Sequence, residues 1–218
     1  EIMPSLVGSE MCIRDRYVDE LSPAAQIIGA VNTIVNDDGR LTGYITDGEG
    51  FVHNLKDHGV DIKGKKITVA GGGGAATAIQ VQCALDGARE ITIFNIKDAF
   101  FERTLQTAEK IRKAVPGIVV NVYDIADTAK MTEEIQSSDI FANATIVGMK
   151  PMDDQSVVKD LSAFRPGLVV ADAVYNPEET KLLREAKEAG CTCIGGKGML
   201  LWQGVAAFKP YTGQDMPV

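Results

Sequence analysis

Apolar and polar positions alternate along the first third of the chain in a way that predicts a small α/β unit. A polar cluster at residues 36–39 separates two strand-like runs, which is typical of a β-hairpin. The apolar spacing after the hairpin is helical, and Gly59 is the expected C-terminal stop of that helix. The expected elements are a short helix and turn at residues 17–28, strands at 30–35 and 41–45, and a helix at 48–55.

From residue 66 onward the pattern changes to an alternation of buried strands and helices. The strand-like runs lie at residues 66–70, 90–94, 119–123, 140–142, 168–172 and 191–194. Helical patterns between them cover residues 75–85, 98–115 and 177–189. Strands that alternate with helices in this way predict a parallel, doubly wound sheet. We therefore expect an α/β fold with a boundary near residues 59–64.

The overall composition narrows the classes of partner. Of 218 residues, 45% are apolar and 24% are charged, fractions typical of a soluble globular protein of about one and a half domains. No uncharged apolar run approaches the ~18 residues of a membrane span, so no membrane association is expected. With 22 basic and 30 acidic residues the net charge is −8, and the absence of a basic stripe argues against nucleic acid as a partner.

The cysteines and histidines predict no metal site. Cys12, Cys83, Cys191 and Cys193 form no C-x-x-C motif, and the two histidines do not complete a zinc set. Small core cysteines are typical of a reducing compartment, so we expect a cytoplasmic protein. Residues 1–16 show neither helical nor strand periodicity and no secretory signal, and we treat them as foreign or unstructured.

Four consecutive glycines stand where the run at residues 66–70 passes into a helix. Gly71, Gly73 and Ala76 fit the pattern G-x-G-x-x-A, and Gly74 completes the glycine run. The first glycine permits a tight turn, the second lets a pyrophosphate approach the backbone, and the small third residue lets helix and strand pack closely. The helix N-terminus adds N–H donors and a positive dipole. This order predicts dinucleotide binding, against the alternative of a glycine-rich turn in an unrelated α/β domain.

An acidic residue after the second strand of this unit bears on the choice of cofactor. Asp98 follows Gly73 by 25 positions, near the spacing at which an acid binds the adenosine ribose. A carboxylate at that place accepts hydrogen bonds from the ribose diol and repels a 2′-phosphate, which favours NAD over NADP. Lys97 keeps NADP possible, and Asp98 is also placed to cap the following helix.

Two polar segments outside the glycine turn are candidates for chemistry. Asp47 lies at a turn between a strand and a helix, where an acid serves either in catalysis or as a helix cap. Asn143 and Thr145 follow a strand of the predicted parallel sheet. Because ligands bind at the carboxyl edge of such sheets, we expect both residues to face the cofactor crevice.

Several strings, taken together and in order, resemble the shikimate dehydrogenase family, and most of all its quinate/shikimate dehydrogenase branch. The similarity runs from about residue 18 to the end of the chain. The branch is indicated by Phe94-Asn95 followed by Asp98-Ala-Phe-Phe, and by Val147-Gly-Met-Lys-Pro151. The family motifs are Gly29-Ala-Val-Asn-Thr33, Gly43-Tyr-Ile-Thr-Asp-Gly48, Val69-Ala-Gly-Gly-Gly-Gly-Ala-Ala76, Asn143-Ala-Thr-Ile-Val-Gly-Met149, Val174-Tyr-Asn-Pro177 and Gly198-Met-Leu-Leu-Trp-Gln-Gly204.

The resemblance implies a two-domain enzyme in which a substrate domain precedes a Rossmann domain. Residues 17–62 correspond to a remnant of the α/β substrate domain, and residues 63–198 to the NAD(P)-binding domain. Residues 199–218 correspond to a C-terminal helix that returns to the substrate domain. The implied reaction is reversible hydride transfer between NAD(P) and the C3 hydroxyl of shikimate or quinate, which are small polyhydroxy carboxylates. Oligomeric state is left open between a monomer and a homodimer.

The matching motifs also imply roles for individual residues. Asp47 corresponds to the acid of a catalytic lysine–aspartate pair, which exchanges the alcohol proton as the hydride leaves. Asn32 and Gln203 match positions that hydrogen-bond substrate hydroxyls. The positions expected near the cofactor, from the glycine pattern or from the resemblance, are Gly71, Gly73, Gly74, Ala76, Asn95, Asp98, Asn143, Thr145, Tyr175, Gly198 and Met199.

Some features depart from the family pattern. The catalytic lysine and a serine pair that anchors the substrate carboxylate lie, in the family, upstream of where the similarity begins, and no lysine precedes Lys56. The chain is therefore expected to be an inactive fragment that holds NAD without turnover. Ile96 replaces a common arginine, which removes a 2′-phosphate partner and favours NAD. Another Rossmann dehydrogenase, of the methylene-tetrahydrofolate type, is the remaining alternative.

Overall fold

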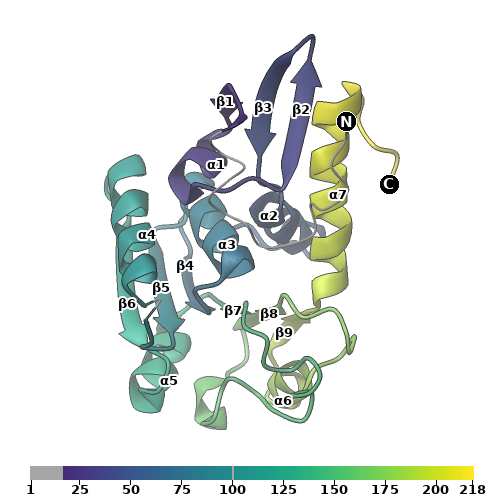
Figure 1. The fold of residues 1–218 in the computed structure, drawn as a ribbon. Coiled ribbons are helices and arrows are strands. Elements are labelled where there is room, and N and C mark those ends of the chain that lie inside the picture. The colour runs from purple at the N-terminus through teal and green to yellow at the C-terminus, as the bar shows by residue number, and fades with distance from the viewer. Residues whose placement is uncertain (1–16, 100) are drawn as a thin grey trace.

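The computed structural model describes residues 17–99 and 101–218. Their strands form two sheets, one of three strands in the order β1-β3-β2 and one of six in the order β6-β5-β4-β7-β8-β9 (Figure 1). The expectation for residues 1–16 falls outside the described residues. Within the described part of the chain, no helix combines the length and apolar character that crossing a bilayer needs.

The six-stranded sheet is parallel throughout, which confirms the predicted doubly wound α/β fold. Two strands extend to one side of β4 and three to the other, so the strand order reverses between β4 and β7. In open α/β sheets, ligands bind at the carboxyl ends of the strands beside such a reversal. The strands are β4 (Lys66–Ala70), β5 (Glu90–Asn95), β6 (Val119–Asp124), β7 (Ile140–Asn143), β8 (Val169–Asp172) and β9 (Thr192–Ile194).

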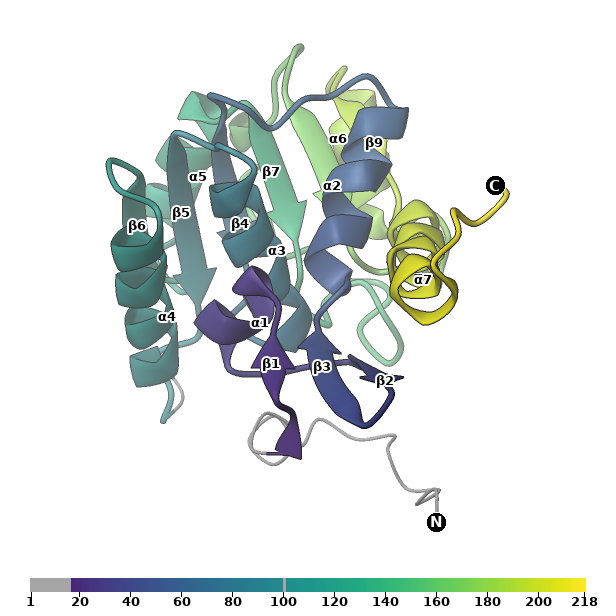
Figure 2. The same cartoon turned by 90° about the horizontal axis from the view of Figure 1, so that it is seen from above.

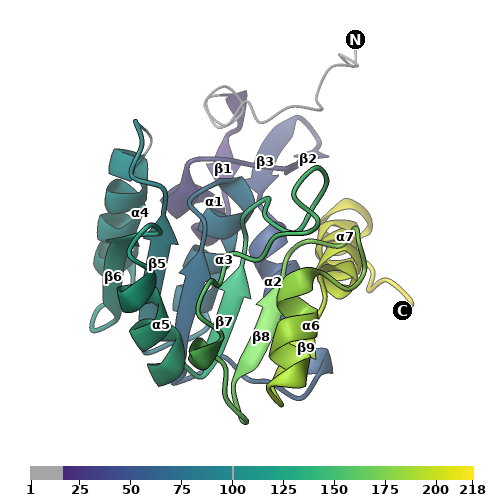
Figure 3. The same ribbon diagram turned by 90° about the horizontal axis from the view of Figure 1, so that it is seen from below.

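Helices cover both faces of this sheet. The helices of one face are α3 (Gly74–Leu85) and α4 (Phe101–Ala114), and those of the other are α5 (Thr128–Ser137) and α6 (Lys181–Glu188). The opposite views of Figures 2 and 3 show the two layers in turn. Side chains alternate along each strand, so Val69 enters one core layer and its neighbour Ala70 enters the other.

Two helix starts differ from the prediction. The predicted start of α6 at Pro177 is wrong, because the helix begins at Lys181, where the hydroxyl of Thr180 accepts a hydrogen bond from the Leu183 N–H at 3.3 Å. A threonine in this cap position satisfies an N–H group that the first turn otherwise leaves free. The predicted start of α4 was also early, since the described helix begins at Phe101.

Helix α5 was not predicted from the apolar spacing. It buries only Met131, Glu134 and Ile135, which leaves too short an apolar stripe for a clear helical pattern. The better signal is the cap: the Asp127 carboxylate accepts a hydrogen bond from the Lys130 N–H at 3.0 Å. The aspartate that directly precedes this helix was therefore the signal from which the helix could have been predicted.

The smaller sheet consists of a hairpin and one short parallel strand. Its strands are β1 (Glu20–Leu21), β2 (Thr33–Asp37) and β3 (Arg40–Tyr44). Asp38 and Gly39 close the hairpin with φ values of 48° and 94°, the left-handed pair that a tight two-residue turn needs. The predicted first strand started too early, because the ladder begins at Thr33. The helix predicted from residue 17 is also shorter, since α1 covers only Pro23–Ile28.

Helix α2 (Asp47–Asp57) follows the hairpin and packs between α3 and the C-terminal helix α7 (Gly196–Thr212), as Figure 2 shows. A Cβ atom at Gly48 would lie 2.4 Å from the carbonyl oxygen of Ala78 on α3. A Cβ atom at Gly50 would lie 2.6 Å from the carbonyl oxygen of Met199 on α7. Glycine at these two positions therefore lets α2 bring its backbone against both neighbouring helices.

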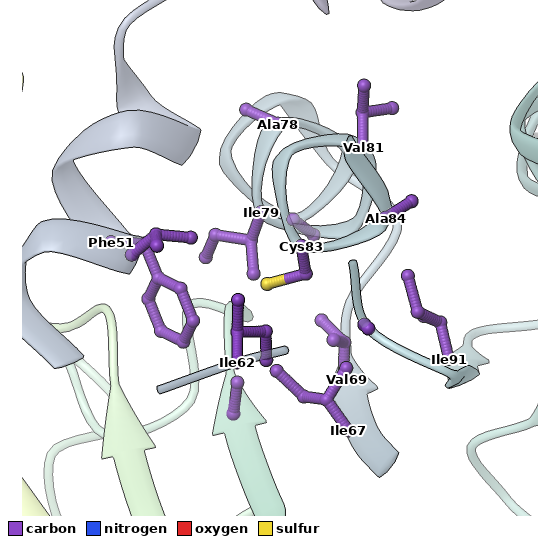
Figure 4. Packing of buried hydrophobic residues seen from close by; sticks show 14 of the residues in the cluster. Phe51, Ile62, Ile67, Val69, Ala78, Ile79, Val81, Cys83, Ala84 and Ile91 are labelled. Atoms are coloured by element: carbon purple, nitrogen blue, oxygen red, sulfur yellow. The ribbon is translucent and has the colours of Figure 1, made fainter. Parts of the chain in front are cut away.

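The core beneath α2 and α3 joins the helices to the six-stranded sheet. Figure 4 shows Phe51 of α2 and Ile79 of α3 directed into the same space, close to Ile62 and Ile67. The same apolar cluster also contains Val31, which precedes the hairpin. This cluster contains residues from both sides of the predicted domain boundary at residues 62 and 63. The division of the chain into domains stays a prediction.

The glycine contact of α2 generates a stability test. Gly48→Ala should destabilise the chain by about 1–3 kcal/mol, because the new methyl group meets backbone that cannot move without shifting α3. Gly204→Ala on α7 is the matched control, since no atom lies within 4 Å of its Cβ position and it should be neutral or stabilising by up to about 1 kcal/mol. Urea unfolding measures both changes, and equal effects would contradict the packing argument.

Candidate active site

The glycine turn lies where the strand order reverses, at the carboxyl edge of the six-stranded sheet. Gly71 has a φ of 122°, and a Cβ atom there would lie 2.6 Å from the carbonyl oxygen of Ala144, which follows β7. The Gly71 N–H donates to the Phe94 carbonyl of β5 at 2.7 Å, and the Ala144 N–H donates to the Ala70 carbonyl at 2.8 Å. The ends of β4, β5 and β7 are therefore held together around this turn.

The first turn of α3 is open to solvent on the side of the glycine turn. Gly73 and Gly74 are exposed, and nothing lies within 4 Å of a Cβ position at Gly73. Gly73 caps the helix without any side-chain hydrogen bond, so the N–H groups of this turn can receive an anion. Ala76 is fully buried, and its Cβ lies 3.2 Å from the Cβ position of Gly71, where a larger side chain would not fit.

A buried glutamine that the sequence patterns did not single out supports the same turn. The Nε2 of Gln80 on α3 donates to the carbonyl oxygen of Gly71 at 3.0 Å. Gln80 is fully buried, and its Oε1 has no protein partner. A polar side chain in this position satisfies a carbonyl that the left-handed turn takes out of the strand ladder.

The end of β5 brings Asn95 and Asp98 to the same edge of the sheet. The Asn95 Nδ2 donates to the Thr104 Oγ1 at 2.9 Å, and the Asn95 side chain lies against Gly72 of the glycine turn. Asp98 is exposed in the connection to α4, where its carbonyl accepts the Phe101 N–H at 3.1 Å. The structure therefore places Asn95 against the glycine turn and Asp98 in the connection between β5 and α4.

Asn143 ends β7 at the carboxyl edge of the sheet, and its side chain is buried. Its side chain is 1% exposed, and its Nδ2 donates to the Asp172 Oδ1 at 2.9 Å and to the Val147 carbonyl at 3.1 Å. Its Oδ1 accepts the N–H of Thr145 at 3.1 Å and the Thr145 hydroxyl at 2.7 Å. The buried Asn143 side chain therefore holds the loop after β7 through Val147 and the half-buried Thr145.

Asp172 ends β8, next to Asn143 at the carboxyl edge of the sheet, and the sequence analysis did not single it out. Its carboxylate accepts the Thr180 hydroxyl at 2.7 Å and the Val174 N–H at 3.0 Å, in addition to the Asn143 amide. Burial raises the pKa of Asp172 above its usual range in spite of these hydrogen bonds. An acid at the carboxyl end of a buried strand was the available signal, and here it organises the loops of the site.

Asp47 and Asn32 meet at the first turn of α2. The Asn32 Nδ2 donates to the Asp47 Oδ2 at 2.8 Å and to the Thr46 Oγ1 at 3.2 Å, while its Oδ1 accepts the Thr46 N–H at 3.1 Å. Asn32 is exposed, so its amide is accessible. Two residues that the sequence separates by 15 positions thus form one polar pair beside α3.

Asp47 lies in a low-dielectric setting for a surface carboxyl. Burial raises the pKa of Asp47 above its ordinary 3.8, and the hydrogen bond from Asn32 opposes this shift only in part. Thr46, the residue before it, makes no side-chain cap hydrogen bond to α2. A partly buried carboxyl with a raised pKa is a common property of acid–base groups in active sites.

Helix α7 carries three of the remaining predicted residues, Gly198, Met199 and Gln203. Gly198 lies directly against the Asn54 side chain, which also donates to the Gly195 carbonyl at 3.0 Å. Met199 is buried, and the backbone of Gln203 contacts Gly50, one turn from Asp47. Gln203 is therefore brought near the Asp47–Asn32 pair. Tyr175 follows β8 and is half exposed at the same edge of the sheet.

A cavity of about 610 Å³ lies at the opposite end of α2. Asp57 and Trp202 line it, joined by a hydrogen bond from the indole N–H, and Lys197 pairs there with Glu178. Eleven helical residues span about 15 Å, so this cavity is distant from Asp47. Its lining includes Gly198 but no residue of the glycine turn and neither Asp47 nor Asn32. We therefore place the candidate site at the glycine turn and the Asp47–Asn32 pair.

Comparison with known proteins decides the family. No family model matches the chain. The curated quinate/shikimate dehydrogenase of Escherichia coli O139:H28 is 50% identical over 202 residues, which cover 93% of this chain and 70% of the relative. The chain belongs to the quinate/shikimate dehydrogenase family.

Solved structures agree with this assignment. The crystal structure of shikimate 5-dehydrogenase from Listeria monocytogenes, in complex with shikimate and NAD, is 49% identical with a TM-score of 0.93. The match covers 96% of this chain and 72% of that one. Quinate dehydrogenase from Corynebacterium glutamicum, in complex with NAD, is 30% identical with a TM-score of 0.79, covering 91% and 68%. The predicted resemblance and the prediction of an NAD(P)-dependent oxidoreductase are confirmed.

The resemblance implies a lysine–aspartate pair that includes Asp47. Within residues 17–99 and 101–218, no lysine or arginine forms an ion pair with Asp47. In the same part of the chain, no His, Cys, Asp and Glu side chains gather as a metal site. The role of Asp47 as the acid of a lysine–aspartate pair therefore stays a prediction.

The raised pKa of Asp47 predicts a pH-dependent stability. Because the folded-state pKa lies above 3.8, the unfolded chain loses this proton first as pH rises, so Asp47 lowers the unfolding free energy above that pH. Asp47→Asn should therefore be the more stable protein at pH 7, and its advantage should disappear below pH 3.8. Urea unfolding at several pH values measures the difference, and an advantage that grows toward acid pH would contradict the assignment.

Proposed function

We propose that this chain takes part in reversible hydride transfer between NAD and the C3 hydroxyl of shikimate or quinate. The observation that carries the proposal is the contact of the first turn of α2 with the middle of α3, at Ala78 and Gln82. Gly48 lies against Ala78, about one turn into the helix that the glycine turn begins. This contact fixes Asp47 relative to the helix that begins at the glycine turn, and the oxidation of an alcohol needs an acid–base group near the cofactor.

The glycine turn fits the pyrophosphate of a dinucleotide. Gly73 has open space where a side chain would stand, and the first turn of α3 presents N–H groups with the positive end of the helix dipole. When bound, NAD supplies the acceptor of the hydride. The protein contributes position: Gln80 and the loop after β7 fix the shape of the turn from behind.

The residues after β5 support NAD in preference to NADP. Asp98 is proposed to accept hydrogen bonds from the adenosine ribose, and its negative charge opposes a 2′-phosphate. Ile96, which is 60% exposed, offers that phosphate no cationic partner. Exposed Lys97 is the residue through which NADP remains possible.

Oxidation removes a hydride from the carbinol carbon and a proton from its hydroxyl group. Asn32 and Gln203 are proposed to bind hydroxyl groups of the polyhydroxy carboxylate. Asp47 is proposed as the acid of the lysine–aspartate pair that exchanges the proton. The raised pKa of Asp47 supports this role, because a carboxyl group whose pKa lies closer to the working pH exchanges a proton more readily with its partner.

The second candidate is a chain that binds NAD without turnover. The observation in its favour is that Asp47 has no ion-pairing lysine among the described residues. We also propose a cytoplasmic location, which the free thiols of Cys83, Cys191 and Cys193 support.

Binding of the cofactor tests the proposal. Isothermal titration should show NAD binding with a Kd below about 1 mM. Gly73→Asp should weaken binding at least about tenfold, because the new carboxylate faces the pyrophosphate in space that is otherwise open. Gly73→Asn is the matched control for size and should bind more tightly than Gly73→Asp. No heat from the unmodified chain at millimolar NAD would refute the cofactor assignment.

A further inference from the structure

A hydrogen-bonded pair lies directly behind the glycine turn. The Asn95 Nδ2 donates to the Thr104 Oγ1 at 2.9 Å. A Cβ atom at Gly72 would lie 2.4 Å from that Nδ2 and 2.6 Å from that Oγ1. Both polar atoms therefore contact the backbone of Gly72, and the absence of a side chain at Gly72 makes room for them.

This pair joins three segments that contribute to the cofactor site. Gly72 belongs to the turn proposed to receive the pyrophosphate, and Asn95 ends β5 immediately before the residues proposed to select the ribose. Thr104 lies on α4, which follows those residues. The Asn95 carbonyl also accepts the Ile125 N–H at 2.9 Å, so the main chain of Asn95 is held as well as its side chain.

Packing alone does not explain the hydroxyl group of Thr104. Thr104 is 3% exposed on a helix whose other buried residues are Ala108 and Ile111. A valine of the same shape would fill this space, and threonine and valine have similar preferences for a helix. The hydroxyl is therefore explained by its hydrogen bond to Asn95.

We propose that Thr104 is a positioning residue for the dinucleotide. Through Asn95 it sets the distance between the glycine turn and the ribose-selecting segment that follows β5. Thr104 itself does not touch the cofactor; it keeps the Asn95 amide turned against Gly72 and away from the space that the adenosine ribose needs. This inference rests on the proposed NAD site and names a residue that the glycine pattern does not include.

Three variants test this role by isothermal titration with NAD. Thr104→Val keeps the shape and removes the acceptor, so the Kd should rise about fivefold, the change expected from one net hydrogen bond. Thr104→Ser keeps the hydroxyl and should bind within about twofold of the unmodified chain. Asn95→Ala breaks the same hydrogen bond from the other side and should weaken binding at least as much as Thr104→Val, which keeps the test valid if the valine variant does not fold.

Thr107→Val, one turn along the same helix, is the control and should leave the Kd unchanged. An unchanged Kd in both Thr104→Val and Asn95→Ala would overturn the inference and leave the proposed function standing. A loss in Thr104→Ser equal to that in Thr104→Val would also overturn it, because the hydroxyl would then not matter. Absence of NAD binding by the unmodified chain would overturn the proposed function, and this inference with it.

Discussion

The backbone contact of α2 with α3 and α7 is the constraint on which the arrangement of the site depends. Gly48 and Gly50 lie two positions apart and bring opposite sides of α2 against Ala78 and Met199. Because the contacts are made by main-chain atoms, the helices have little freedom to slide without losing them. Asp47 precedes the first of these glycines, so the contact fixes the acid relative to the start of α3 and hence relative to the glycine turn.

A second set of interactions keeps the carboxyl edge of the sheet in shape. Left-handed Gly71 is supported by Gln80, Gly72 by Asn95 and Thr104, and the loop after β7 by Asn143 and Asp172. These groups are buried or half-buried and bond mainly to one another. A buried polar group that keeps its partners in place costs little, while one that loses a partner is expensive. The protein's own hydrogen bonds therefore hold the shape of this edge.

The parallel sheet was readable from the sequence because its strands are buried on both faces. The strand predicted at residues 66–70 matches β4 residue for residue, and all five of its residues are buried. The glycine turn was readable because backbone conformation at Gly71 restricts the residue type. Helix α5 was missed because its buried stripe is short, and α6 started late because Thr180 provides a cap that apolar spacing does not report.

Long-range partners explain what the sequence did not reveal about the site. Gln80, Thr104 and Asp172 act through bonds to residues on other elements, and no local pattern announces such a bond. Asn143 was found at the right edge, but its buried amide serves Asp172 and the loop. The hydrogen bond between Asp47 and Asn32 was not predicted, because the whole hairpin separates the two residues along the chain.

Turnover tests the central claim most directly, that Asp47 is the acid of a dehydrogenase acid–base pair held beside an NAD site. The measurement is shikimate-dependent NADH formation by the protein and by Asp47→Asn, with NAD titration of both. We predict that Asp47→Asn lowers kcat by about 100-fold while the Kd for NAD stays within about twofold. Equal losses in kcat and in NAD affinity would contradict the account, because Asp47 would then be a structural cap of α2.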